Sequence, residues 1–201
     1  VFGGSYMNWH TKLKEYFPED EMKAKKHFEY LLNEESHIYH LDESEHYVVL
    51  YAEYDSFIFI DYLFVSNASR SKGIGKKILD KYKQKNKTII LEAEPPNIED
   101  LDCGRRLRFY KRESFKHANQ IYYAKKAPIT GEIVPLEILY WTRADVSQKD
   151  VFEKMKKVYQ DIHINHPKGL YKNSHLPTEK VVQWNVEGKD LFADEKTVLT
   201  K

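Results

Sequence analysis

The segment Arg70-Ser71-Lys72-Gly73-Ile74-Gly75 constrains the fold of this chain more than any other. It follows an apolar run, residues 57–65, and precedes apolar residues at helical spacing, residues 74–82. This order predicts a strand, a glycine-containing loop and a helix. The first N–H groups of a helix have no partners within it, and the helix dipole adds partial positive charge there. The segment therefore predicts a site for phosphate or pyrophosphate.

The residues of this loop suit an anion. Gly73 and Gly75 would let a bulky phosphate approach the backbone, because no Cβ stands in the way. Arg70 and Lys72 add positive charge, and Lys76 and Lys77 follow one turn later.

The spacing excludes two common phosphate loops. A Walker A loop needs Ser or Thr after its Gly-Lys pair, and this chain has Lys77 there, with Arg70 at the place of the first glycine. A dinucleotide fingerprint needs a third glycine, and this chain has Ile78 at that place.

Local patterns predict alternating helices and strands up to about residue 142. We expect helices over residues 18–33, 74–82 and 101–112, and strands over residues 46–53, 57–65, 88–94, 115–117, 121–124 and 136–141, the last being the final strand. Beyond residue 142, Ser147-Gln148-Lys149-Asp150 resembles a helix-capping pattern before an amphipathic helix. We therefore predict one domain over residues 7–142 and a C-terminal helical extension over residues 143–201.

Composition limits the other classes of protein. The chain has 201 residues, 41% hydrophobic and 31% charged, and its net charge of +1 provides no general attraction to nucleic acid or membrane. The apolar runs are too short to span a membrane. One cysteine, Cys103, excludes an internal disulfide and fits a reducing compartment. With no visible signal peptide, we expect a cytoplasmic protein; we interpret residues 1–6 as a remnant of cloning and Met7 as the native start.

The loop and the segments after it resemble the GNAT superfamily of acetyl-coenzyme A N-acetyltransferases. The shared features are Arg-x-x-Gly-x-Gly after a strand, a second strand at residues 89–94, and a helix that ends in Phe109-Tyr110 before Phe115. The resemblance covers roughly residues 15 to 142. Two departures are Ser114, where the family usually has Gly, and Ser71, where a second loop Gly is common.

The resemblance implies an α+β fold of three layers, with a mixed, mostly antiparallel central sheet between helices. It also implies acetyl-CoA as co-substrate and direct attack of a primary amine on the thioester. The residues that it places around the coenzyme are Leu63, Phe64, Val65, Arg70, Ser71, Lys72, Gly73, Ile74, Gly75, Lys76 and Asn97. Val65 N–H is the expected donor to the oxyanion, and Tyr110 is the expected acid that protonates the leaving thiolate.

The base is less defined. Glu92 and Glu94 alternate onto one face of their strand, with Ala93 on the other face. They could take a proton from the amine directly or through water, or bind a cationic substrate. They could equally form ion pairs with the arginines of the following helix.

Other patterns have simpler explanations. His37-x-x-His40 and His163-x-x-His166 lack the partners of a zinc site, so we expect no metal. The arginine-rich helix over residues 101–112 could be solvated, contact the 3′-phosphate of coenzyme A or bind an acidic partner. Cys103 has no nearby histidine that would make it a nucleophile.

We therefore expect an N-acetyltransferase that acts on a small-molecule or peptide amine. The alternative is a non-catalytic acyl-CoA-binding or protein-interaction module on the same fold. Neither nucleic acid nor membrane is an expected partner, and a homodimer formed through the terminal strand and helix stays open.

Overall fold

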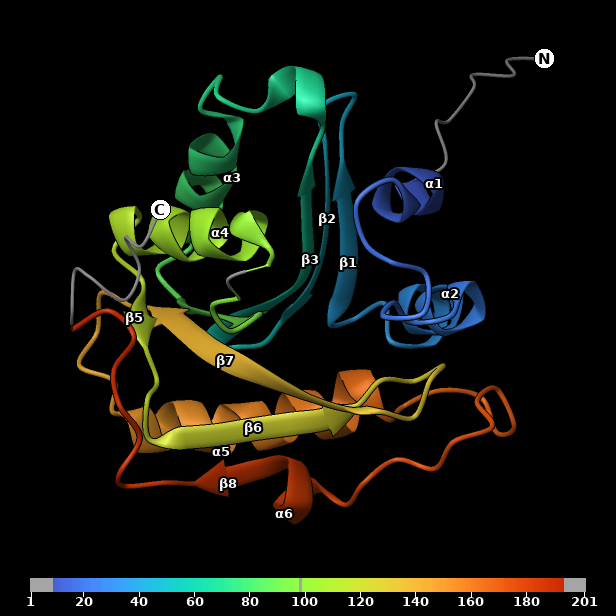
Figure 1. The fold of residues 1–201 in the computed structure, drawn as a ribbon. Helices are drawn as coiled ribbons and strands as arrows, with labels where there is room; N and C mark the ends of the chain where they lie inside the picture. Colours follow the sequence, from blue (N-terminus) through green and yellow to red (C-terminus); the bar gives the residue numbers. More distant parts are fainter. Residues whose placement is uncertain (1–8, 98, 194–201) are drawn as a thin grey trace.

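The centre of the molecule is a sheet of eight strands within the residues that the computed structural model describes, 9–97 and 99–193 (Figure 1). The strands are β1 (Tyr39–Glu43), β2 (Tyr47–Glu53), β3 (Phe57–Val65), β4 (Thr88–Ala93), β5 (Lys116–His117), β6 (Ile121–Lys126), β7 (Ile133–Trp141) and β8 (Val182–Trp184). Their order is β1-β2-β3-β4-β7-β6-β8, with β5 paired to β7. Among these pairs only β3 and β4 are parallel, so the predicted mixed, mostly antiparallel sheet is confirmed.

Helices cover both faces of this sheet. They are α1 (Trp9–Lys14), α2 (Lys25–Glu34), η1 (Asn67–Ser69), α3 (Ile74–Lys83), α4 (Leu101–Arg112), α5 (Gln148–Val158), η2 (Tyr159–His163) and α6 (Thr178–Val181). One core lies between the sheet and α1, α2 and α5, and a second lies between the sheet and α3 and α4 (Figure 1). In the described ranges, no helix has the length and apolar character needed to cross a membrane.

The first predicted helix is shorter than its pattern indicates. The pattern covers residues 18–33, but α2 begins at Lys25, and residues 19–22 form turns. Lys23 is held by the sheet instead: its N–H donates to the hydroxyl of Tyr62, and its Nζ lies 2.8 Å from Asp61. These tertiary contacts outweigh the local preference for helix, which is weak by comparison.

Two strands are absent from the prediction, and both lie at edges of the sheet. In β1 only Tyr39 is buried, and the rest of the strand lacks the alternation that marks a half-buried strand. β8 has three residues and pairs with β6. Within residues 9–193 as described, the final strand is therefore β8, and the prediction that residues 136–141 form the last strand is wrong.

The chain after residue 142 packs against the same sheet. The predicted cap is present, because Ser147 and Asp150 form a reciprocal capping box at the start of α5. Val151 and Met155 of α5 belong to the same buried core as Phe59 of β3. Residues 1–6, interpreted as a remnant, and the last residues of the predicted extension, 194–201, lie outside the described residues.

Candidate active site

The parallel strands β3 and β4 diverge halfway along their length. They pair from Phe57 with Thr88 to Ile60 with Leu91, and no pairing continues beyond that point. A β-bulge begins the divergence: Ile60 and Tyr62 face consecutive residues of β2, so Asp61 is the extra residue. The C-terminal half of β3 therefore has one backbone edge that is not paired with β4 and that faces the space between the two strands.

The backbone of that half of β3 is oriented toward the opening. Ser66 N–H donates to the carbonyl of His46, which makes Val65 and Tyr47 a non-hydrogen-bonded pair of the antiparallel ladder. By alternation, Leu63 has the same orientation. The N–H and C=O groups of Leu63 and Val65 thus point away from β2 and toward the space that β4 has left.

The start of α3 presents free N–H donors. Within the described residues, the N–H groups of Gly73, Ile74, Gly75 and Lys76 have no hydrogen-bond acceptor, whereas Lys77 N–H donates to the Gly73 carbonyl. No side chain caps the helix. The loop therefore offers an uncapped helix N-terminus, the arrangement that binds phosphate groups.

The two glycines are required for different reasons. Gly73 has φ +73°, which a residue with a Cβ rarely adopts, and a Cβ there would have open space around it. Gly75 is needed for packing, because a Cβ would lie 3.1 Å from the ring of Phe109. Ser71 and Ser114, the two departures from the family pattern, also have positive φ, of 66° and 65°. These serines keep the backbone conformation for which glycine is the usual choice.

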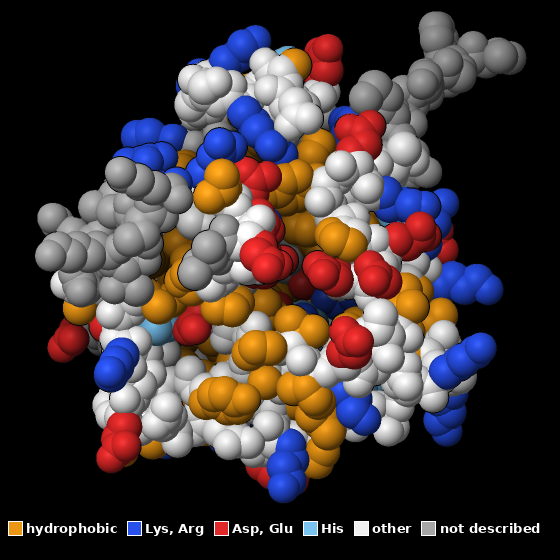
Figure 2. All heavy atoms as spheres, in the orientation of Figure 1, with side chains coloured by type: hydrophobic (Ala, Val, Ile, Leu, Met, Phe, Trp, Pro, Cys, Tyr) orange, Lys and Arg blue, Asp and Glu red, His pale blue; other side chains and the backbone are white. Residues whose placement is uncertain are grey.

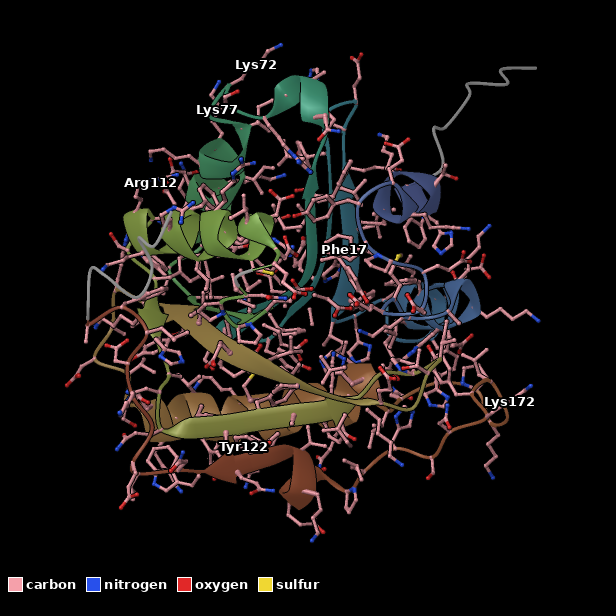
Figure 3. All side chains as sticks on the ribbon, in the orientation of Figure 1. Phe17, Lys72, Lys77, Arg112, Tyr122 and Lys172 are labelled. Carbon is pink, nitrogen blue, oxygen red and sulfur yellow. The ribbon has the colours of Figure 1, made fainter. Side chains whose placement is uncertain are left out.

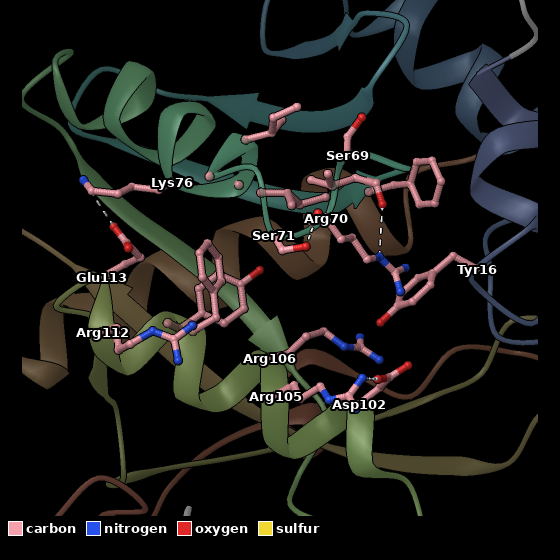
Figure 4. Close-up of a pocket in the computed structure, with 18 residues that line it drawn as sticks. Tyr16, Ser69, Arg70, Ser71, Lys76, Asp102, Arg105, Arg106, Arg112 and Glu113 are labelled. Carbon is pink, nitrogen blue, oxygen red and sulfur yellow. Dashed lines mark hydrogen bonds and ion pairs between the residues drawn. The ribbon is translucent and has the colours of Figure 1, made fainter. Parts of the chain in front are cut away.

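A cavity of about 560 Å³ extends from this loop along β3 to α4 (Figure 4). Nine of the eleven residues predicted around the coenzyme line it: Leu63, Phe64, Val65, Arg70, Ser71, Gly73, Ile74, Gly75 and Lys76. Lys72 does not line it and points away from the loop in Figure 3. Asn97 lies in a neighbouring cleft, where its side-chain oxygen accepts a hydrogen bond from Glu99 N–H. We call the cavity the coenzyme channel.

Tyr16, which no sequence motif selects, lies at the end of the coenzyme channel. Its ring lies between two guanidinium groups, 4.7 Å from Arg70 and 5.1 Å from Arg106 (Figure 4). Arg70 Nε also donates to the carbonyl of Val65 at 3.3 Å. The Nε of Arg106 is buried and has no hydrogen-bond partner in the described part of the chain, so it is available to a ligand.

Tyr110 lies where the channel reaches the divergence of the strands. It lines the coenzyme channel and a small cavity of about 60 Å³ between β3 and β4. Burial raises the pKa of its phenol to about 12, with a smaller opposing effect from Arg106. Its hydroxyl forms no hydrogen bond within the described ranges. The side chain is therefore neutral at pH 7, and its O–H group is available to donate to a ligand.

A second cleft, of about 640 Å³, opens beside the channel on the face shown in Figure 2. The two cavities share Tyr16, Asp102 and Arg106. The small cavity between β3 and β4 also joins them, because it is lined by Leu63 and Tyr110 of the channel and by Glu92 and Glu94 of the cleft. We call the second cleft the acceptor cleft.

Glu92 is the centre of a buried polar network. It accepts a hydrogen bond from the Tyr123 hydroxyl and one of 3.0 Å from Lys125. His163 of η2 places its Nε2 2.8 Å from Glu92, out of line for a hydrogen bond. Burial would raise the pKa of Glu92, but these neighbours outweigh it and hold the pKa well below its ordinary value. Burial lowers the pKa of His163 to about 4, so the positive charge that faces Glu92 at pH 7 belongs to Lys125.

Glu94 is more accessible than Glu92. One of its oxygens accepts a hydrogen bond of 2.7 Å from the Cys103 thiol and lies 3.5 Å from Arg106. Glu94 therefore combines the two predicted alternatives: it lines the acceptor cleft and also pairs with an arginine of the arginine-rich helix. The thiol of Cys103 also donates to Asp100, and burial together with the two carboxylates raises its pKa strongly. It is therefore a protonated hydrogen-bond donor at neutral pH.

Comparisons with known proteins agree with these features. No family model matches the chain. A Bacillus subtilis (strain 168) protein named as an acetyltransferase, YjbC, is 48% identical over 177 residues, which cover 88% of this chain and 92% of YjbC. The structure of a GNAT-family acetyltransferase from Bacteroides thetaiotaomicron matches with a TM-score of 0.63 and 20% identity, over 76% of this chain and 88% of that one. At that identity the second likeness concerns the fold.

The diverging strands, the uncapped helix and the sequence relationship define an acyltransferase. This chain belongs to the GNAT superfamily of acetyltransferases. Its co-substrate is acetyl-CoA, as in that family.

Proposed function

We propose that this enzyme transfers the acetyl group of acetyl-CoA to a primary amine by direct attack of the amine on the thioester. The observation that carries the proposal is the junction at Tyr110, where the coenzyme channel meets the acceptor cleft through the gap between β3 and β4. A thioester carried along β3 would reach this junction from one side and an amine from the other. The two reactants need no covalent enzyme intermediate in this arrangement.

The chain can hold the coenzyme mainly with backbone groups. The free N–H groups of residues 73–76 are the proposed ligands of the pyrophosphate, with Arg70 and Lys76 adding charge. The outward N–H and C=O groups of Leu63 and Val65 are the proposed partners of the pantetheine amides. This arm would extend β3 at the edge where β4 no longer pairs.

The oxyanion of the tetrahedral intermediate needs a fixed donor. Val65 N–H is the donor expected from the family resemblance, but Val65 lies toward the loop, whereas Leu63 lines both the channel and the small cavity beside Tyr110. We therefore assign the donor to Leu63 N–H and the pantetheine contact to Val65. One such donor contributes about 3 kcal/mol to lowering a barrier of this kind.

Tyr110 is the proposed acid. The thiolate of coenzyme A leaves with the electron pair of the C–S bond and takes the phenolic proton. A phenol whose pKa is raised to about 12 is protonated at pH 7, so it can donate its proton to the sulfur as negative charge develops there, and a proton from the acceptor ammonium or from solvent then restores the phenol. Burial thus keeps Tyr110 in the protonated form that the step requires.

The base is proposed to be Glu94, acting directly or through water. Both oxygens of Glu92 are occupied by Tyr123 and Lys125, and its lowered pKa makes it a weak proton acceptor. Glu94 keeps one oxygen without a partner in the described residues and lines the acceptor cleft. The proposed role of Glu92 is instead structural: its contacts with Tyr123 and Lys125 stabilise the base of the cleft.

Isothermal titration with acetyl-CoA, followed by a thiol-release assay over a panel of primary amines, tests the proposal. We expect saturable binding and release of free coenzyme A with at least one amine. Binding without release from any amine would favour the alternative of a non-catalytic acyl-CoA-binding module. Absence of binding by the folded protein would contradict both.

A further inference from the structure

The acceptor cleft has an excess of negative charge. Six carboxylates line it, Glu21, Asp61, Glu92, Glu94, Asp100 and Asp102, against the cations Arg106 and Lys125. Figure 2 shows acidic side chains gathered around the hollow at the centre of this face. The question is how many of these charges the protein itself neutralises.

Four of the six have a cationic partner. Lys23 lies 2.8 Å from Asp61 in a pair that is almost completely buried, and Lys125 lies 3.0 Å from Glu92. Glu94 and Asp102 pair with arginines of α4, at 3.5 and 3.2 Å. Because each of these four carboxylates has a cation beside it, they contribute little net negative charge to the cleft.

Glu21 and Asp100 are the remaining two. In the described part of the chain, no Lys, Arg or His nitrogen lies within 4.0 Å of either carboxylate. Asp100 accepts hydrogen bonds from Asp102 N–H and the Cys103 thiol, whereas the Glu21 side chain has no partner in the described residues. Burial and the charges of Glu94, Asp20 and Asp100 raise the pKa of Glu21 and outweigh the opposing charge of Arg106.

The rest of the cleft is mainly apolar. Its other walls include Phe17, which Figure 3 shows in the opening between α4 and α2, and Leu136. Five prolines also line it: Pro18, Pro95, Pro96, Pro128 and Pro135. Proline has no N–H donor and a restricted backbone, so this surface suits methylene groups better than a hydrogen-bonding sugar or peptide backbone.

On the basis of the proposed function, we infer that the acceptor is a small aliphatic amine with at least two cationic groups, of the alkyl diamine or polyamine class. One amino group reacts at the junction beside Tyr110. The methylene chain lies against the proline wall, and Glu21 with Asp100 binds the second ammonium. A lysine side chain in a protein presents one ammonium and leaves the second charge unmatched.

The first test compares 1,4-diaminobutane with 1-aminobutane, which has the same carbon chain and one ammonium fewer, in the thiol-release assay. We expect a kcat/KM at least tenfold higher for the diamine, with the difference shrinking as salt is added. Equal values for the two amines, or better turnover with a lysine-containing peptide, would overturn the inference while leaving the acetyltransferase activity established. If acetyl-CoA binds but no amine of the panel causes release of free coenzyme A, the proposed function and the inference would both be overturned.

The second test uses Glu21→Gln, which keeps the shape of the side chain and removes its charge. The ratio of kcat/KM for the diamine to that for the monoamine should fall at least fivefold, chiefly through KM. The matched control is Glu19→Gln, because Glu19 lies in the same segment, is exposed and pairs with Lys14 outside the cleft. An unchanged ratio in Glu21→Gln, or an equal fall in the control, would remove Glu21 from its assigned role.

Discussion

The coenzyme channel and the acceptor cleft are built on different principles, although they meet at Tyr110. Backbone groups dominate the channel: free N–H donors at the start of α3 and the outward edge of β3. Side chains dominate the cleft: carboxylates, their cationic partners and a wall of prolines. A backbone site depends on the conformation of the chain, whereas a side-chain site depends on which residues occupy it. The first should therefore respond to changes in φ and the second to changes in charge.

Tyr110→Phe should have the largest effect, because it removes the proposed acid at the junction of the two regions. We expect kcat to fall by about a hundredfold, the lower range for loss of a general acid. The affinity for acetyl-CoA should change less than threefold, since the ring and its packing stay. Steady-state kinetics and isothermal titration separate the two effects, and unchanged kcat with a good amine would exclude Tyr110 as the acid.

Glu92→Gln should destabilise the fold more than it affects coenzyme binding. The substitution leaves Lys125 without its buried counter-ion, for an expected loss of about 2 kcal/mol in the free energy of unfolding. Denaturant unfolding measures this loss. Glu94→Gln, two residues further along the chain, is the matched control, and its loss should stay under about 0.5 kcal/mol because Glu94 is partly exposed. Equal losses would mean that the two glutamates do not differ in their structural roles.

Gly73→Val should weaken acetyl-CoA binding by about tenfold or more. A β-branched residue strongly disfavours the φ of +73° that directs the N–H groups of α3 into the channel, while the open space around Gly73 leaves no clash to explain the loss. Lys72→Ala is the control, and its dissociation constant should change less than threefold because Lys72 does not line the channel. A larger loss of acetyl-CoA affinity in Lys72→Ala than in Gly73→Val would contradict the distinction between a backbone site and a side-chain site.

Acid should destabilise the protein through its buried histidines. His27 Nε2–H donates to the backbone carbonyl of Asn165, its Nδ1 accepts from the Tyr171 hydroxyl, and burial lowers the pKa of His27 to about 2. In the unfolded chain His27 therefore binds a proton near pH 6.5, whereas in the folded protein it stays neutral. The contribution of His27 to stability is complete above pH 6.5 and is lost progressively as the pH falls below it. Each such histidine contributes a slope of up to about 1.4 kcal/mol per pH unit. His27→Gln should reduce the slope between pH 6 and 4 in denaturant unfolding, and an unchanged slope would assign it to other groups.

The difference between the two regions also explains what the sequence could predict. The loop at Arg70 to Gly75 has local spacing that can be recognised without a structure, and nine of eleven predicted coenzyme residues line one cavity. Asn97 and Lys72 lie elsewhere because a strand-to-helix motif fixes the backbone and leaves the direction of each side chain open. The sequence predicts Gly75 beside a phosphate and contains no sign that a Cβ there would meet the ring of Phe109, a contact that only the fold brings about.

The acceptor cleft was less predictable because its residues come from distant segments. Glu21 lies in a stretch whose pattern indicates helix, and contacts of Lys23 with β3 keep that stretch in turns beside the cleft. Tyr16 shows no periodic signal at all. The sequence predicts Glu92 and Glu94 on one face of a strand, but β4 ends at Ala93, so only Glu92 lies in it. The different partners of the two carboxylates, Lys125 from β6 and Cys103 from α4, depend on tertiary packing.

A crystal structure of the protein with coenzyme A bound at saturating concentration tests the central claim most directly. We predict the diphosphate within hydrogen-bond distance of the N–H groups of residues 73–76, and the pantetheine arm beside Leu63 and Val65. A coenzyme held elsewhere, with this helix end vacant, would contradict the account.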